Sequence, residues 1–319
     1  AAFELDYSLE KAPSSRLVLV VGAGPAGLAA SCYLAAKGHK VTLIERKEQM
    51  GGQFNLAMQV PGKEDFNHTL NYFTNELKRL NVDLQLGTEF TDNMLNQYDD
   101  VVFATGVRPR EAKIECGDGK RVFAYDEVIR GEVELGDKIA ILGAGGIGFD
   151  VSEFIVHKGD SPSLNTEHFM KEWGVDLSVE HRGGIQGVTA EVPAPAREVY
   201  LLQRKASKVG KNLGKTTGWI HRTSLKNRHV QMVPGVTYRK IDDEGLHITI
   251  TPKGAEQGED KILPVDTIIV CAGQEPLREL QAGVEAAGIP VHLIGGADVA
   301  AELDAKRAIN QGSRLAAEI

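Results

Sequence analysis

The stretch Gly22-Ala23-Gly24-Pro25-Ala26-Gly27 follows the apolar run Leu17–Val21 and opens a segment with helical periodicity. The same G-x-G-x-x-G pattern returns at Gly143-Ala144-Gly145-Gly146-Ile147-Gly148, after the run Lys138–Leu142. In this motif the first glycine makes a tight turn, the second lets the backbone approach a pyrophosphate, and the third packs the helix on the strand. The amino terminus of the helix then faces the anion. Two copies in strand–turn–helix context predict two dinucleotide sites on one chain.

Size, composition and charge are those of an ordinary globular protein. The 319 residues are enough for about two domains. A net charge of −8 argues against a nucleic-acid partner, and no apolar run approaches the roughly 20 residues that span a membrane. Residues 1–15 are predicted to form a polar tail or linker and lack the features of a signal peptide. We therefore expect a cytoplasmic protein with no membrane partner.

The three cysteines restrict the chemistry that this chain can perform alone. Cys32, Cys116 and Cys271 lie far apart and form no C-x-x-C pair. This spacing excludes a metal or cluster framework built from this chain, and also the reactive cysteine pair of disulfide reductases. We expect no metal site. We also expect no catalytic side chain, because the cofactors perform the hydride transfer and the protein supplies position and electrostatics.

Each glycine motif is predicted to begin a β-α-β unit. In the first unit a helix over 25–37 is followed by a strand over 40–45. In the second unit a helix over 147–157 precedes an irregular insertion, 159–197, and then the strand 198–203. We interpret the insertion as surface elaboration, with a cap over the cofactor or a docking surface as the alternatives.

Further elements complete the two halves. They are a helix at 64–80, strands at 82–86, 99–104, 267–271 and 291–294, an antiparallel meander of 230–233, 236–241 and 246–251, and a closing helix at 305–317. Two of these strands end in Thr105-Gly106 and in Gly295-Gly296-Ala297-Asp298. Loop backbone is therefore expected at the carboxyl edge of the sheet, where ligands of such folds bind.

The first site is predicted to hold an adenine dinucleotide. Glu45 stands about 20 residues beyond the first glycine turn, where a carboxylate accepts hydrogen bonds from an adenosine ribose. A negative charge there repels a 2′-phosphate, so the site fits FAD or NAD rather than NADP. Asp298 can accept a hydrogen bond from a ribityl hydroxyl, and the helix after it can point its amino terminus at a flavin, which favours FAD. The candidate residues of this site are Gly22, Gly24, Pro25, Ala26, Gly27, Glu45, Arg46, Gly52, Gln53, Thr105, Gly106, Gly296 and Asp298.

The second site is predicted to hold NADPH. The strand 198–203 ends without an acid, in Gln203-Arg204-Lys205. Loss of the carboxylate beside adjacent cations is the pattern that accepts a 2′-phosphate, because arginine offers a planar fork and lysine a point charge. The segment 210–216 looks like a P-loop but is one residue short between its glycines, so we do not predict triphosphate hydrolysis. The candidate residues of this site are Gly143, Gly145, Gly146, Ile147, Gly148, Gln203, Arg204, Lys205 and Gln274.

With these motifs in place, residues 16–319 resemble the C-terminal half of bacterial NADPH-dependent 2,4-dienoyl-CoA reductases, enzymes of fatty acid β-oxidation. The similarity is most specific in four stretches, Gly51-Gly52-Gln53-Phe54-Asn55, Gly143 to Asp150, Gln203 to Arg222 and Gly295 to Gln311. In that family a preceding barrel domain binds FMN, a four-iron cluster and the enoyl thioester, and this sequence contains none of it. The resemblance implies a fragment or split subunit that retains the NADPH-to-FAD step and lacks dienoyl reduction by itself.

The motifs and the resemblance predict an α/β chain of two Rossmann-like, disulfide-reductase-type domains, the second inserted into the first. The FAD domain would comprise residues 1–110 and 277–319, and the NADPH domain residues 111–276. The expected function is hydride transfer from NADPH to FAD, with electrons destined for an FMN and iron–sulfur barrel domain in the same or a separate chain. Two alternatives stay open: a stand-alone NADPH:acceptor oxidoreductase, and a non-redox module that binds ADP or another nucleotide.

Overall fold

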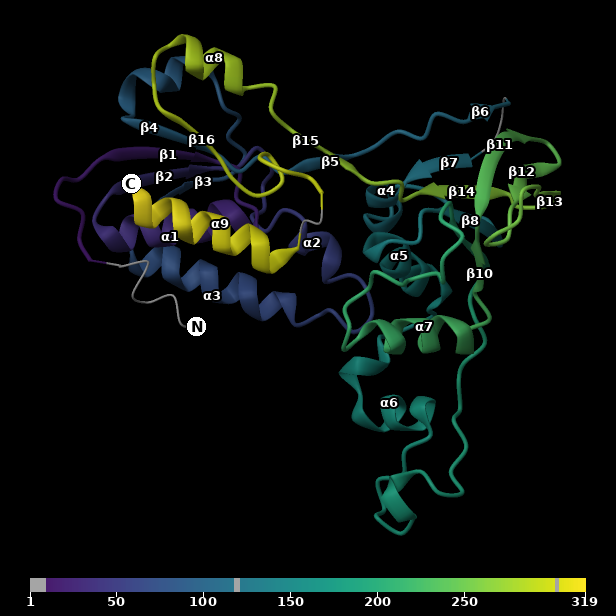
Figure 1. The fold of residues 1–319 in the computed structure, drawn as a ribbon. Coiled ribbons are helices and arrows are strands. Elements are labelled where there is room, and N and C mark those ends of the chain that lie inside the picture. Colours follow the sequence, from purple (N-terminus) through teal and green to yellow (C-terminus); the bar gives the residue numbers. More distant parts are fainter. Residues whose placement is uncertain (1–9, 118–120, 302–303) are drawn as a thin grey trace. The chain divides into compact units, whose positions relative to one another are not determined.

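Both glycine motifs follow a strand at the centre of a parallel sheet (Figure 1). The computed structural model describes residues 10–117, 121–301 and 304–319, and of the expected N-terminal tail residues 1–9 lie outside this part. Within the described ranges, no helix has both the length and the apolar content needed to cross a bilayer. The predicted α/β class with parallel sheets is confirmed.

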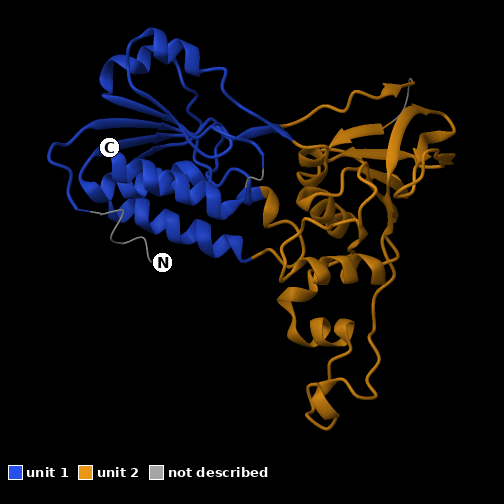
Figure 2. Cartoon of the chain, in the orientation of Figure 1, with its two compact units in different colours: residues 1–55, 65–108, 274–319 blue, residues 56–64, 109–273 orange. Residues whose placement is uncertain are grey.

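The chain divides into two compact units (Figure 2). Unit 1 comprises residues 1–55, 65–108 and 274–319, and unit 2 comprises residues 56–64 and 109–273. The chain passes from one unit to the other at β5 (Val107–Pro109) and returns at β15 (Gln274–Pro276), and these two strands pair with each other. The short helix α2 (Phe54–Ala57) contains another of the boundaries.

The sheet of unit 1 has the strand order β16-β4-β1-β2-β3 and is parallel throughout. Its strands are β1 (Leu17–Val21), β2 (Lys40–Ile44), β3 (Asp83–Gln85), β4 (Asp100–Phe103) and β16 (Val291–Leu293). Both faces are covered, as parallel sheets require. One face bears α1 (Pro25–Lys37), α3 (Phe66–Arg79) and α9 (Ala305–Glu318), and the other bears η1 (Asp92–Gln97) and α8 (Gln281–Ala286) (Figure 1).

Helices α1 and α9 pack closely because glycine lies where they meet. A Cβ on Gly312 of α9 would lie 2.5 Å from the Ala26 carbonyl oxygen and 2.8 Å from the Ala30 amide nitrogen of α1. A Cβ on Gly27 would lie 1.9 Å from the Gly22 carbonyl oxygen. Larger residues would force these backbones apart. The end of β1, the start of α1 and the middle of α9 are thus held together at the first glycine motif.

The main sheet of unit 2 has the order β10-β9-β8-β14-β7 and is also parallel. Its strands are β7 (Arg121–Ala124), β8 (Lys138–Leu142), β9 (Glu198–Gln203), β10 (Gln231–Pro234) and β14 (Thr267–Val270). Side chains alternate along β8, since Ile139 and Ile141 pack on one face and Ala140 and Leu142 on the other. The first face bears α4 (Tyr125–Ile129), α5 (Gly146–Val156) and α7 (Gly218–Asn227), and the second bears a sheet of β6 (Glu115–Cys116), β11 (Val236–Asp242), β12 (Gly245–Ile250) and β13 (Glu259–Leu263).

The small antiparallel sheet differs from the sequence prediction. The sequence predicts residues 230–233 as its first strand, but β10 lies parallel to β9 at the edge of the main sheet. The antiparallel strands are β11, β12 and β13, and the sequence predicts no strand at β13. The prediction is wrong for β10 because a short apolar run fits a parallel edge strand as well as a hairpin strand.

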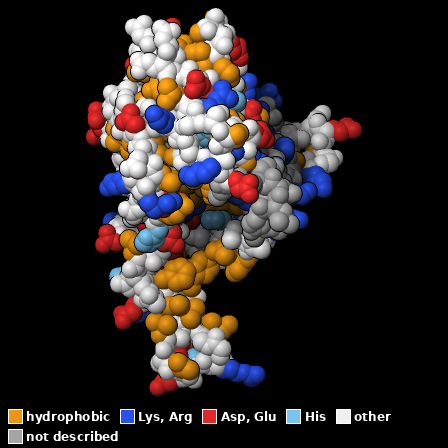
Figure 3. Space-filling model, turned by 90° about the vertical axis from the view of Figure 1, so that its left-hand side faces the viewer, with side chains coloured by type: hydrophobic (Ala, Val, Ile, Leu, Met, Phe, Trp, Pro, Cys, Tyr) orange, Lys and Arg blue, Asp and Glu red, His pale blue; other side chains and the backbone are white. Residues whose placement is uncertain are grey.

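The insertion 159–197 contains a helix where the sequence predicts irregular chain. This helix, α6 (Thr166–Trp173), lies between the short 3-10 helices η2 (Pro162–Leu164) and η3 (Arg182–Gly184). Helix α6 is anchored by buried Arg228 at the end of α7. The Nη2 of Arg228 donates to Glu172 Oε1 of α6 at 2.6 Å. Apolar side chains on the insertion are exposed, among them Leu164 and Val179, and Figure 3 shows them gathered on the arm at the bottom of the view.

Candidate functional site

The first glycine motif forms a tight turn at the end of β1. Gly22 has φ = +105°, and its amide donates to the Ile44 carbonyl at 2.8 Å. An added Cβ would lie 2.6 Å from the Ala104 carbonyl oxygen. Glycine adopts such a backbone without strain. The turn is therefore held against the ends of β2 and β4 at the same time.

Glu45 follows β2, and its carboxylate is fixed against this turn. Its Oε2 accepts a hydrogen bond from the Ala23 amide at 2.9 Å, and its Oε1 accepts one from the Lys47 amide at 3.0 Å. A carboxylate offers about four acceptor positions, so two remain for the hydroxyls of a ligand. The structure brings Glu45 and the glycine turn together, as the sequence predicts.

The loop Gly51-Gly52 lies on the same turn. The Gly51 amide donates to the Ala23 carbonyl at 2.8 Å, and a Cβ on Gly52 would lie 2.9 Å from the Gly24 Cα. Gln53 follows this loop directly, whereas Arg46 is exposed beyond the tip of β2. Backbone thus covers the first glycine turn without an intervening side chain.

The late loop, Gly295-Gly296-Ala297-Asp298, reaches the start of α1. Gly295 has φ = +63°, and a Cβ there would lie 2.8 Å from the Ala26 Cβ. The Thr105-Gly106 turn is tied to Leu277, because Thr105 Oγ1 donates to the Leu277 carbonyl at 2.7 Å and the Leu277 amide donates to the Gly106 carbonyl at 3.1 Å. The first-site candidates therefore surround the carboxyl ends of the strands of unit 1.

The second glycine motif repeats the contacts of the first. Gly143 has φ = +117°, and its amide donates to the Leu202 carbonyl at 3.0 Å. A Cβ there would lie 2.4 Å from the Cys271 carbonyl oxygen. A Cβ on Gly148 would lie 1.9 Å from the Gly143 carbonyl oxygen. Gly143 and Gly148 thus have counterparts with the same contacts in unit 1, namely Gly22 and Gly27.

A cavity of about 430 Å³ opens over the second turn. A Cβ on Gly145 or Gly146 would meet no heavy atom within 4 Å, so the amino terminus of α5 is accessible from the cavity. The described residues that line it include Arg204, Lys205 and Lys211 and no aspartate or glutamate. The cavity therefore suits an anionic ligand at a helix amino terminus.

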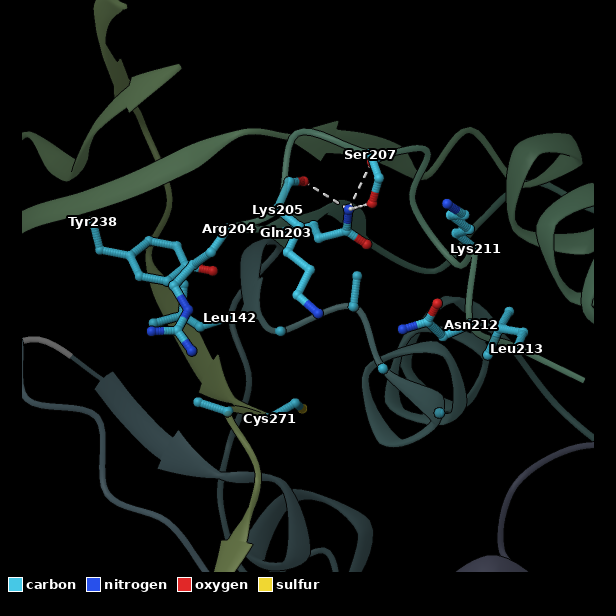
Figure 4. A pocket seen from close by; sticks show the side chains of 15 residues that line it. Leu142, Gln203, Arg204, Lys205, Ser207, Lys211, Asn212, Leu213, Tyr238 and Cys271 are labelled. Atoms are coloured by element: carbon cyan, nitrogen blue, oxygen red, sulfur yellow. Dashed lines mark hydrogen bonds between the residues drawn. The ribbon is translucent and has the colours of Figure 1, made fainter. Parts of the chain in front are cut away.

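Gln203 organises the loop that contains two of these cations (Figure 4). Its Nε2 donates to the Lys205 carbonyl and to the Ser207 carbonyl, each at 2.7 Å. These bonds close residues 203–207 into a compact turn whose cationic side chains border the cavity.

By strand register, Gln203 is the counterpart of Glu45. Leu202 pairs with Leu142, and Ile44 pairs with Val21, so the next residue occupies the same place in each unit. Arginine and lysine then follow in both, as Glu45-Arg46-Lys47 and Gln203-Arg204-Lys205. At these matched positions the two strand tips differ by a carboxylate in one unit and an amide in the other.

Tyr238 of β11 lies beside Arg204 on one side of the cavity, opposite Lys211 and Asn212 (Figure 4). Burial raises the pKa of Tyr238 to about 12, although the nearby Arg204 guanidinium acts in the other direction. The phenol is therefore protonated at neutral pH, and its Oη donates to the Leu202 carbonyl at 3.4 Å. The sequence prediction missed Tyr238, since nothing in its position on the chain indicates that β11 borders the glycine turn.

A second group that the sequence prediction missed consists of Lys63 in the segment 56–64, Asp150 of α5 and His221 of α7, all in unit 2. Lys63 Nζ donates to both carboxylate oxygens of Asp150, at 2.6 and 2.7 Å. Burial, and then the Lys63 ammonium, lower the pKa of half-buried His221, so its ring is neutral at pH 7. Only the position of Asp150 on the motif helix could have pointed to this cluster.

Gln274, predicted for the second site, is the first residue of β15 and belongs to unit 1.

The hairpin of β11 and β12 brings three potential metal ligands together. Ligand atoms of Asp242, Glu244 and His247 lie within 4.8 Å of one another. Lys240 Nζ already contacts Asp242 at 2.6 Å, and with His247 it holds the pKa of that carboxyl well below its usual range. We assign no metal to this group.

Comparison with known proteins places the chain in a family. Residues 16–307 match the pyridine nucleotide-disulphide oxidoreductase family. A metal reductase of Desulforamulus reducens is 30% identical over 303 residues, which cover 93% of this chain and 43% of that protein. A bilirubin reductase of Mediterraneibacter gnavus is 27% identical over 314 residues, which cover 97% and 42%. The chain therefore spans about two fifths of the length of these relatives.

Solved structures agree with this fold. A complex of 2-naphthoyl-CoA reductase with 2-naphthoyl-CoA matches 98% of this chain and 41% of its own, with a TM-score of 0.78 and 25% identity. A thioredoxin reductase of T. acidophilum matches 95% of this chain and 96% of its own, with a TM-score of 0.59 and 15% identity, a likeness of fold alone. The predicted disulfide-reductase-type domains are confirmed. Because the family match covers almost the whole chain, this protein belongs to the pyridine nucleotide-disulphide oxidoreductases, which are FAD- and NAD(P)H-dependent enzymes.

Proposed function

We propose that this chain transfers hydride from NADPH to FAD as the electron-input part of a 2,4-dienoyl-CoA reductase. One observation carries the proposal. The two glycine turns have equivalent contacts, but the strand tip beside them ends in Glu45 in unit 1 and in Gln203 in unit 2. A carboxylate favours a free ribose, whereas a neutral residue beside cations tolerates a 2′-phosphate.

Unit 1 is the proposed FAD site. Glu45 would accept hydrogen bonds from ribose hydroxyls, since the Ala23 and Lys47 amides use only part of its capacity. The backbone amides at the start of α1 would face the pyrophosphate. A Cβ on Gly24 would lie 3.9 Å from the Gly52 Cα, so two glycine backbones border the space that the pyrophosphate would share. Asp298 would accept a hydrogen bond from the ribityl chain.

Unit 2 is the proposed NADPH site. The open backbone at Gly145 and Gly146 would receive the pyrophosphate, and Arg204 and Lys205 would bind the 2′-phosphate. Hydrogen bonds to charged groups contribute about 1.5–3 kcal/mol each. Two of them would favour NADPH over NADH by roughly two to four decades, at about 1.4 kcal/mol per decade.

When bound, FAD accepts a hydride and so supplies the redox chemistry. The residues of this chain bind and orient the two cofactors. We assign no redox role to the buried thiols, because burial raises the pKa of Cys32 to about 12 and also raises that of Cys271, which keeps both protonated. This agrees with the absence of a cysteine pair in the sequence.

We further propose that the electrons continue to a barrel domain with FMN and a four-iron cluster that reduces an enoyl-CoA thioester. Two findings support this. The relatives are more than twice as long as this chain, since it covers 43% of one and 42% of the other. The 2-naphthoyl-CoA reductase was solved with a CoA thioester, 2-naphthoyl-CoA. By this proposal the chain alone does not reduce dienoyl-CoA.

The test is an anaerobic titration of the FAD-loaded chain with NADPH and with NADH, followed through the flavin absorption. We expect NADPH to bleach the flavin at concentrations at least about 100-fold lower than NADH. Equal responses to the two would contradict the assignment of unit 2. A chain that binds ADP and refuses FAD would instead support the nucleotide-binding module, and rapid NADPH turnover with oxygen alone would support a stand-alone oxidoreductase.

A further inference from the structure

The late loop of unit 1, residues 295–298, is held by a side chain from the middle of a helix. Gln311 of α9 accepts a hydrogen bond from the Gly295 amide through Oε1 at 2.9 Å, and it donates from Nε2 to Asp298 Oδ2 at 2.6 Å. One amide group thus bridges the first and last residues of the loop. Only a group with both an acceptor and a donor can make this bridge.

The backbone that bears Gln311 is itself fixed. The next residue, Gly312, is where α9 lies against α1, and a Cβ there would be 2.5 Å from the Ala26 carbonyl oxygen. Gly295 contacts the same residue from the other direction, because its own Cβ would be 2.8 Å from the Ala26 Cβ. The loop, α1 and α9 therefore meet at one point, and Gln311 has little freedom to move away from the loop.

Arg278 supports the loop from a different segment. Its Nε donates to the Ala297 carbonyl at 2.6 Å, and its Nη2 donates to the Asp298 carbonyl. Within the described part of the chain, both hydrogen bonds of Arg278 go to backbone carbonyls, whereas Gln311 donates to the Asp298 carboxylate. Among the described residues, the hydrogen bond from Gln311 fixes Oδ2 and leaves Oδ1 for a ligand hydroxyl.

We propose that Gln311 is a positioning residue that orients the Asp298 carboxylate for a cofactor hydroxyl and thereby sets the affinity of unit 1 for FAD. This inference rests on the proposed FAD site. Gln311 acts through Asp298 and the Gly295 backbone, so it contributes to FAD affinity by holding the Asp298 carboxylate in one orientation. Preorganised groups raise affinity because less freedom is lost when the ligand binds.

Two substitutions distinguish the hydrogen bond that Gln311 accepts from Gly295 from the one that it donates to Asp298. Gln311→Glu keeps an acceptor for the Gly295 amide, but at neutral pH it removes the donor and places a second negative charge beside Asp298. Gln311→Met keeps the approximate volume and removes both hydrogen bonds. Gln281→Glu is the matched control, because Gln281 donates to Glu285 at 2.7 Å on the exposed helix α8 of the same unit. It introduces the same charge away from the loop.

The experiment is an FAD titration of the apoprotein by flavin fluorescence, on the whole chain, between about pH 5 and pH 8. We expect Gln311→Glu to raise the Kd for FAD about 10- to 100-fold at pH 7.5, the factor of one hydrogen bond to a charged group. The affinity should recover toward pH 5, because the adjacent Asp298 charge raises the pKa of the introduced carboxyl, which then protonates and donates to Asp298 again. Gln311→Met should lose affinity at every pH, and Gln281→Glu should match the unchanged chain.

The outcomes distinguish this inference from the proposed function. If the unchanged chain binds no FAD, the proposed function fails. If it binds FAD and both Gln311 variants stay within about twofold of its Kd at every pH, only the positioning role fails. A merely structural role would lower the melting temperature of the apoprotein in both variants without a pH-dependent change in FAD affinity, and that result would also overturn the inference.

Discussion

The two glycine turns of this protein are the same structure with different surroundings. In both, a Cβ on the first glycine would meet the carbonyl oxygen of the residue that follows a neighbouring strand. A Cβ on the last glycine would meet the carbonyl oxygen of the first glycine. In unit 1 the turn is covered by Gly51-Gly52, and the adjoining carboxylate of Glu45 binds it. In unit 2 the turn opens on a cavity, and the matching residue, Gln203, bonds to its own loop. The motif therefore specifies a turn that suits a pyrophosphate, and by our proposal the residue at the neighbouring strand tip determines which dinucleotide binds there.

The largest effect is expected where the two turns are identical. Gly148→Ala puts a Cβ 1.9 Å from the Gly143 carbonyl oxygen, whereas Gly145→Ala puts one where no atom lies within 4 Å. We expect Gly148→Ala to destabilise unit 2 by about 3 kcal/mol or more, because a packed backbone cannot yield. Gly145→Ala should leave the melting temperature unchanged and still weaken NADPH binding at least about tenfold, since the methyl group would occupy the pyrophosphate position.

These two variants test the comparison directly. Thermal unfolding measures the first effect and NADPH titration the second. The same pattern should appear in unit 1, where Gly27→Ala also places a Cβ 1.9 Å from a carbonyl oxygen, that of Gly22. If Gly27→Ala were tolerated and Gly148→Ala were not, the two turns would not be equivalent.

The next-largest effect is expected when the residues at the two strand tips, Gln203 and Glu45, are each replaced by the other type. Gln203→Glu replaces the donor to the Lys205 and Ser207 carbonyls by an acceptor and adds a charge that repels a 2′-phosphate. We expect it to lower the preference for NADPH over NADH about 10- to 100-fold. Glu45→Gln should weaken FAD binding by about tenfold and leave the nicotinamide preference unchanged. Steady-state kinetics with both nicotinamides, together with FAD titration, measure these changes, and a shifted nicotinamide preference in Glu45→Gln would overturn the assignment of the two units.

A similar effect is expected from the cations that follow each tip. Arg204→Glu should reduce the preference for NADPH by about 100-fold, through a loss of NADPH affinity with little change for NADH. Arg46→Glu is the control, because Arg46 occupies the matched position in unit 1. Increasing ionic strength should weaken NADPH binding more in the unchanged chain than in Arg204→Glu. If the two variants had the same NADPH affinity, Arg204 would not contact the phosphate.

The smallest effect is expected on the pH dependence of stability, through the short connection between α1 and β2. In unit 1 only Gly38-His39 joins α1 to β2, and His39 is buried with its Nδ1 accepting from the Arg16 amide at 3.2 Å. Burial, and then nearby Lys37 and Arg16, lower the pKa of His39 below 6.5. The unfolded chain therefore binds a proton more readily than the folded chain. The stabilising effect is complete above pH 6.5 and is lost as the pH falls from 6.5 through the lowered pKa.

The measurement is the stability of the chain toward urea between pH 5 and pH 7.5. We expect the stability of the unchanged protein to rise with pH across about this range, and His39→Gln should reduce that slope. His68 is exposed on α3 of the same unit, and His68→Gln serves as the comparison. An unchanged slope in His39→Gln would mean that His39 titrates equally in the folded and unfolded chain.

The sequence predicts the elements that depend on local pattern. The strands over 17–21, 138–142 and 198–203 and the helix over 25–37 have the predicted ends. For the strands over 17–21 and 138–142, an apolar run between a polar start and a glycine turn determines both limits. The helix α6 is missed, because it is short and its segment contains several loop-forming residues. The strand β13 is missed, since four of its five residues are exposed and their side chains give no apolar alternation.

The sequence predicts only those residues of the candidate sites that lie within one motif or directly follow it. Glu45, Gln203 and the glycines follow from motif spacing, and the structure places them at the strand ends. Tyr238, Lys63 and Gln311 come from segments that meet these sites only in the folded chain. No local pattern can indicate such meetings. The matched position of Glu45 and Gln203 itself becomes visible only through the strand register.

Arginine and lysine follow the strand tip in both units, so only Glu45 and Gln203 distinguish the two triplets. Glutamate and glutamine codons differ by a single nucleotide in the standard genetic code. One base change is therefore enough to convert one triplet into the other, while the turn, the helix and both cations stay in place. By the roles proposed for Glu45 and Gln203, this single change would shift the balance between NADPH and NADH while the fold is unaltered.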